Sequence, residues 1–145
     1  MPDPTRAEAD EIIQQVKTIG EDVSWQAVPG CRTPRWHLRA SIVAPQIHGT
    51  LRITGKYGKT NWAFTLLAND VPIRKLTYHR NAPHRNPDGT TIRDSHKHRW
   101  DEINRDREAY VPDDIAFSDV NQAFLDFLHE CNITLHGRYQ QLIPI

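Results

Sequence analysis

Four histidines gather in the middle of the sequence. His79 and His84 precede the run Asn86-Pro87-Asp88-Gly89, and His96 and His98 follow it. That run favours a turn, because Pro presets the first corner, Asp bonds back to the backbone and Gly accepts a positive φ. We expect the turn to join the strand of His79 to the strand of His96 and His98. Imidazoles titrate near neutral pH, so a group of them could take up and release protons in a reaction.

The alternation of residues around the last two histidines predicts which side chains share a face. Successive side chains of a strand point to opposite faces. If residues 95–100 are extended, His96 and His98 lie on one face with Trp100, whereas Lys97 and Arg99 lie on the other.

Acid–base cleavage of RNA is the chemistry that these residues favour. One imidazole would remove the 2′-hydroxyl proton, another would protonate the leaving oxygen, and cations would stabilise the charge on phosphorus. We assign the proton transfers to His84, His96 and His98. The hypothesis is that of a metal-independent endoribonuclease with no cofactor.

The same hypothesis assigns auxiliary roles to neighbouring residues. Phosphate contacts are assigned to Arg80, Lys97 and Arg99, and supporting roles to His79, Trp100 and Glu102.

Two other interpretations stay open. The pair His96 and His98, with a third histidine and a carboxylate such as Asp101 or Glu102, could ligate zinc or another divalent metal. Alternatively, the histidines are surface hydrogen-bonding groups or part of a docking surface.

The charge pattern bears on the partner. The 145 residues carry 18 basic and 18 acidic side chains and have no net charge. Residues 31–107 hold 15 basic and 6 acidic side chains and six of the eight histidines, whereas residues 1–30 and 108–145 are acidic. A basic centre of this kind is compatible with RNA or another nucleic acid as the partner, although the whole chain is neutral.

The elements that must position these residues follow from periodicity. A capping box at Thr5 and an apolar stripe predict a helix that ends at Gly20. Period-two patterns predict strands at 36–42, 51–53, 62–66 and 73–79, and a final helix starts near Ser118 and stops at Asn132. We expect a single domain, 1–145, of the α+β class, with an antiparallel β-meander of five to six strands and an N-terminal and a C-terminal helix packed on it.

Composition excludes several classes. No window approaches the roughly 18 apolar residues of a membrane span, and the first residues lack the plan of a signal peptide. Cys31 and Cys131 are a hundred positions apart, so a disulfide framework is not indicated, and Cys131 is expected in the core. We expect a cytoplasmic protein that does not contact a membrane.

One stretch of the chain resembles a known family. The run Ala82-Pro83-His84-x-Asn86-Pro87-Asp88-Gly89, then His96-x-His98-x-Trp100-x-Glu102, then a helix leading to Cys131-Asn132-Ile133, resembles an uncharacterised bacterial and phage domain family. The resemblance covers roughly residues 73–135 and implies no established activity. Trp100 stands where that family often has Tyr.

A looser similarity is to the TumE-type toxins of toxin-antitoxin modules. It depends on Asn81-Ala82-Pro83-His84 and His96-Lys97-His98. The similarity implies a small toxin-like or mobile-element protein that acts on RNA and has a cognate antitoxin. The alternative is a non-enzymatic phage or mobile-element protein that inhibits a host defence complex or docks on nucleic acid.

Overall fold

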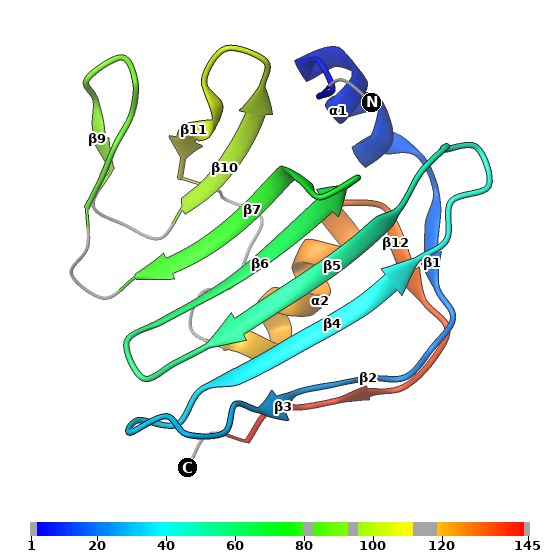
Figure 1. Cartoon of the computed structure of the whole chain (residues 1–145), viewed down its shortest axis with the longest axis vertical. Coiled ribbons are helices and arrows are strands. Elements are labelled where there is room, and N and C mark those ends of the chain that lie inside the picture. Colours follow the sequence, from blue (N-terminus) through cyan, green and yellow to red (C-terminus); the bar gives the residue numbers. More distant parts are fainter. Residues whose placement is uncertain (1–2, 80–82, 93–95, 112–118, 144–145) are drawn as a thin grey trace.

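The computed structural model describes residues 3–79, 83–92, 96–111 and 119–143. Two helices, α1 (Arg6–Gln14) and α2 (Val120–Glu130), accompany a large antiparallel sheet (Figure 1). The expected α+β class is confirmed, but the sheet has seven strands where the sequence predicts five or six.

The large sheet has the strand order β11-β10-β7-β6-β5-β4-β3. All neighbouring pairs in it are antiparallel. The strands β4 to β7 form a meander, and β10 and β11 extend it at one edge. Their bounds are β3 (Gln26–Ala27), β4 (Trp36–Ile42), β5 (Leu51–Tyr57), β6 (Asn61–Ala68), β7 (Val71–His79), β10 (His96–Asp101) and β11 (Arg105–Tyr110).

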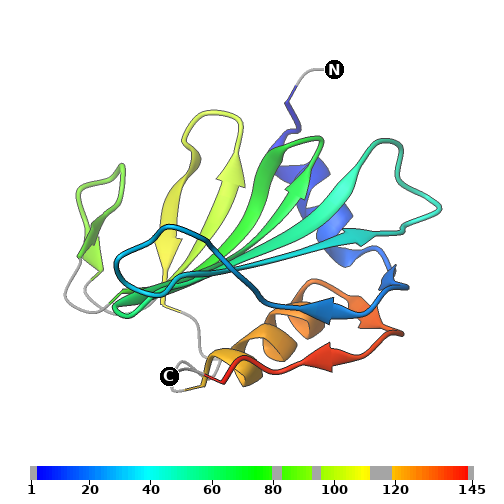
Figure 2. The same ribbon diagram turned by 60° about the horizontal axis from the view of Figure 1, so that its bottom comes forward.

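One face of the sheet packs on the core, and the other face does not. Apolar side chains at every second position of β4, β5 and β6 are buried on the first face, which α2 covers (Figure 2). Phe64 packs against Phe124 and Phe127 of α2, with ring centroids 5.2 and 6.3 Å apart. The alternate positions make up what we name the open face: His37, Arg39, Arg52, Lys56, Lys75, Thr77, His79, His96 and His98.

Helix α1 begins as the sequence predicts. Thr5 is its N-cap and forms a capping box with Glu8. The expected end at Gly20 is wrong, because the helix ends at Gln14 and residues Lys17–Ile19 form the strand β1. The buried Ile19 therefore joins the core from a strand.

Lys17 explains how the helix stops early. Its ammonium group donates to the backbone carbonyls of Ile12, Ile13 and Gln15, which satisfies acceptors that the helix leaves open. Burial lowers the pKa of Lys17 to about 8.

Three small strand pairs lie outside the large sheet. The strand β1 pairs in parallel with β12 (Ile133–Leu135), and β2 (Val23–Ser24) pairs in parallel with β13 (Tyr139–Gln140). The third pair, β8 (His84–Arg85) with β9 (Thr91–Ile92), is antiparallel. The predicted turn at 86–89 closes this small hairpin, so the expectation that it directly joins β7 to β10 is wrong.

Helix α2 ends close to its predicted limits. Its N-cap is Asp119, and the predicted start near Ser118 lies outside the described residues. Its C-cap is Cys131, which is buried as expected, and Asn132 adopts a positive φ of 55°. Neither helix of the described ranges is long and apolar enough to cross a membrane.

A charge cluster joins α2 to the sheet. Glu130 at the end of α2 accepts from Arg74 of β7 at 2.7 Å and pairs with Lys97 of β10 at 3.1 Å. The three side chains are only 13%, 12% and 2% exposed. Removal of one partner from a buried group of this kind leaves charge that is neither solvated nor paired.

We therefore expect Glu130→Ala to lower the free energy of unfolding by about 3–5 kcal/mol. Urea denaturation would measure this loss. The control is Gln122→Ala on the exposed side of the same helix, for which we expect a change within about 0.5 kcal/mol. Equal effects of the two substitutions would show that the cluster does not stabilise the fold.

Candidate functional site

The structure brings three of the four central histidines together. His84 comes from β8, and His96 and His98 come from β10. One ring nitrogen from each lies within 4.8 Å of the other two. The ring centroids are 4.7 Å apart for His96 and His98, 4.8 Å for His84 and His98, and 5.1 Å for His84 and His96. We name these three residues the histidine triad.

Strand register places the triad on the open face. His96 is directly opposite Thr77 of β7, and His98 is opposite Lys75. Directly opposed residues of antiparallel strands share a face. The ring of His79 stacks on that of His96 at 6.4 Å.

A cavity of about 230 Å³ lies at the triad. We name it the histidine pocket, and its lining residues are Lys75, Thr77, His79, Pro83, His84, His96 and His98.

Strand β11 fixes two of the three rings. The Nε2 atom of His84 is 2.8 Å from the backbone oxygen of Arg107, and the Nδ1 atom of His98 is 2.8 Å from that of Asp106. A carbonyl oxygen only accepts, so the hydrogen must lie on the ring nitrogen in both bonds. In the neutral rings this leaves an unprotonated nitrogen, Nδ1 of His84 and Nε2 of His98.

The environment disfavours charge on two of the histidines. Burial, and then the neighbouring His96, lowers the pKa of His98 to about 4. Burial, and then Lys75, lowers the pKa of His79. The buried hydroxyl of Thr77, which lines the same pocket, has no hydrogen-bond partner among the described residues.

Asn86 docks the hairpin that carries His84. Its side-chain amide donates to the carbonyl of Ala109 at 3.0 Å and accepts from the Ala109 N–H at 2.8 Å. It also donates to the hydroxyl of Thr90 across the turn. Asn86 therefore joins the β8–β9 hairpin to β11, the strand whose carbonyls hold His84 and His98.

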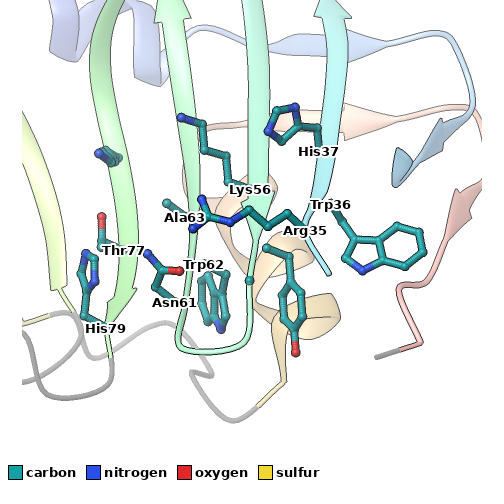
Figure 3. Close-up of a pocket in the computed structure, with 12 residues that line it drawn as sticks. Arg35, Trp36, His37, Lys56, Asn61, Trp62, Ala63, Thr77 and His79 are labelled. Carbon is teal, nitrogen blue, oxygen red and sulfur yellow. The ribbon is translucent and has the colours of Figure 1, made fainter. Parts of the chain in front are cut away.

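A second cavity of about 230 Å³ adjoins the histidine pocket (Figure 3). We name it the basic trough, and its lining residues are Arg35, Trp36, His37, Lys56, Tyr57, Gly58, Asn61, Trp62, Ala63, Lys75, Thr77 and His79. Lys75, Thr77 and His79 line both cavities, so the two adjoin along these side chains. No carboxylate of the described residues lines either of them.

The residues expected to bind phosphate are not in the pocket. Lys97 and Arg99 point to the helix-covered face, where Lys97 pairs with Glu130 and the guanidinium of Arg99 lies 4.0 Å from the centroid of the Tyr110 ring. The predicted alternation is therefore confirmed for these two, but it separates them from the histidines. Arg80 lies outside the described residues.

The supporting residues divide in the same way. His79 lines the pocket, whereas Trp100, expected beside His96 and His98, does not line it and is a core residue whose Nε1 donates to the carbonyl of Pro4. The register of β10 with β11 is irregular between Arg99 and Asp101, at Trp100. Glu102 accepts from the backbone N–H of Arg6 at 2.8 Å. Asp101 accepts from the N–H groups of residues 103 and 104, so neither carboxylate joins the triad.

Sequence reasoning missed Lys75, Thr77 and Asn86 as site residues. The first two could have been found, because the period-two pattern of 73–79 places residues 75, 77 and 79 on one face. The role of Asn86 depends on a contact 23 positions away, and local sequence carries no signal of that distance.

The fold and site define an α+β protein whose open sheet face carries a histidine pocket next to a basic trough. The chain belongs to a family described as "Family of unknown function (DUF6978)", which matches residues 5–133. The expected membership of an uncharacterised family is thus confirmed, over a longer stretch than the motifs alone cover. No curated protein and no solved structure matches the chain, and nothing in the comparisons links it to TumE toxins.

We expect Asn86→Ala to release the β8–β9 hairpin from β11. Amide hydrogen exchange of residues 84–92 should accelerate, because a pair of hydrogen bonds worth about 1 kcal/mol each is lost. The His84 ring signals in NMR spectra should move, whereas amides of β5 and β6 keep their protection. Arg85→Ala, at an exposed position of the same hairpin, is the matched control and should leave both measurements unchanged.

Proposed function

We propose that the protein binds RNA along the basic trough and cleaves it at the histidine pocket. The observation that carries the proposal is that the two cavities adjoin and share Lys75, Thr77 and His79 as lining residues. A strand of RNA in the trough would thereby present a phosphodiester to the triad.

The charge of the trough supports a polyanionic ligand. Arg35, just before β4, Lys56 of β5 and Lys75 of β7 line it, and none of them forms an ion pair within the described residues. By contrast, Arg52 of the same face is paired with Asp70 at 2.8 Å. Uncompensated cations along a groove favour phosphate contacts that depend on salt but not on sequence.

The chemistry of the pocket supports cleavage. Imidazole nitrogens, a buried hydroxyl and a lysine converge there, and phosphodiester cleavage needs groups that move protons and a cation that stabilises the added charge. Proton transfers by His84, His96 and His98 remain a proposal. We propose Lys75, which lines the pocket, as the cation that contacts phosphate in place of Lys97 and Arg99. A toxin-like role, with an antitoxin or a host defence protein as partner, remains a prediction from resemblance alone.

We expect Lys56→Ala to weaken binding of a labelled single-stranded RNA about five- to tenfold and to lower the slope of log affinity against log salt by about one. Fluorescence anisotropy at several salt concentrations would measure both. Lys59→Ala is the matched control, because Lys59 is exposed in the adjoining turn but does not line the trough. Equal losses in the two variants would contradict binding in the trough.

We expect His84→Ala to abolish RNA cleavage while RNA affinity stays within about twofold. Cleavage would be followed by gel electrophoresis of labelled RNA, and circular dichroism would confirm folding. His129→Ala on α2, beneath the opposite face of the sheet, should cleave like the wild type. RNA binding by the wild type without any cleavage would instead favour the non-enzymatic binding protein.

A further inference from the structure

The histidine triad has the composition of a metal centre. Three imidazoles with a fourth position open to water is a ligand set that proteins use for catalytic zinc. The triad supplies three such ligands from two elements, and the adjoining cavity leaves space for a further ligand.

The distances are close to those that one ion requires. Two nitrogens at about 2.0–2.1 Å from a tetrahedral zinc ion are separated by about 3.4 Å. The triad nitrogens lie within 4.8 Å of one another, so an approach of at most about 1.4 Å would close the site. Rotation of the three rings would supply part of this approach, and for His84 a small shift of its two-stranded hairpin, which lies outside the large sheet, would supply more.

Outer contacts of the kind seen at metal sites are already in place. A histidine that binds metal through one nitrogen usually donates its other N–H to a carboxylate or a backbone carbonyl. His84 and His98 make such bonds to consecutive residues of β11, Arg107 and Asp106. Both carbonyls belong to β11, whereas the rings belong to β8 and β10. The two hydrogen bonds fix the orientation and the tautomer of both rings.

The surroundings also fit neutral ligands. No described carboxylate lines the histidine pocket, so a charged imidazolium there would have no counter-ion. Neutral imidazoles that share a metal ion need no counter-ion. The hydroxyl of Thr77, which has no hydrogen-bond partner in the described ranges, lines the same pocket and could bond to a water or a phosphate oxygen on the ion.

We propose that His84, His96 and His98 bind one zinc ion, with the remaining ligand position open to the histidine pocket. This replaces the metal-free assignment that the sequence favours. It concerns the same pocket as the proposed RNA cleavage but does not depend on that activity. In the zinc-bound protein the three imidazoles would be ligands and would not transfer protons.

Isothermal titration of the metal-free full chain with zinc chloride tests the proposal without RNA. We expect one site per chain, and X-ray absorption of the complex should show nitrogen ligands at about 2.0–2.1 Å. His84→Ala should weaken the affinity more than about a hundredfold, because loss of an outer contact alone costs about 10–100-fold. His98→Asn is the second ligand variant, and thermal denaturation would confirm that each variant folds.

Matched controls separate the triad from other histidines. His48→Ala and His129→Ala remove exposed histidines that belong neither to the triad nor to the lining of the two cavities. Both should bind zinc within about threefold of the wild type. Wild-type affinity weaker than about 1 mM, or affinity unchanged in His84→Ala, would overturn the proposal. RNA cleavage that persists in such a protein would support metal-free catalysis, whereas zinc binding without cleavage would leave the metal site standing.

Discussion

The antiparallel register between β7 and β10 is the constraint on which the site depends. It sets His96 opposite Thr77 and His98 opposite Lys75, and so puts both histidines on the open face. Because the side-chain period of a strand is two, a slip of one residue would exchange the histidines for Lys97 and Arg99. The ion pair of Lys97 with Glu130 opposes that slip, since it would carry a buried ammonium group away from its carboxylate. Lys97, which sequence reasoning assigned to phosphate, thus helps to hold the histidines in position.

Strand β11 holds two of the histidine rings and the hairpin that carries His84 in position. Its backbone carbonyls at 106 and 107 orient two imidazoles, and its residue Ala109 receives the side chain of Asn86. A backbone acceptor holds a ring in place independently of the side chain at that position. The hairpin with His84 shares no strand with the large sheet, so its position relative to β10 depends on these contacts.

The parts of this arrangement that local sequence encodes were predictable. Period-two alternation predicted the meander and the opposite faces of His96 and Lys97. Capping signals predicted the start of α1 and the end of α2. The rest depends on partners distant in the chain. The parallel pairing of β1 with β12 joins residues more than a hundred positions apart, and the early end of α1 depends on the ammonium group of Lys17. The turn at 86–89 was recognised, but periodicity did not show that it closes a separate hairpin.

The neutral net charge also acquires a physical meaning from the faces of the sheet. On the helix-covered side, Arg74 and Lys97 are balanced by Glu130 because they are buried. On the open side, Arg35, Lys56 and Lys75 line the trough without such partners and are solvated. Buried charge must be paired where it lies, whereas solvated charge can be left for a ligand. It is therefore the division of charge between the two faces, rather than the total or its distribution along the chain, that leaves the histidine pocket next to cations and apart from carboxylates.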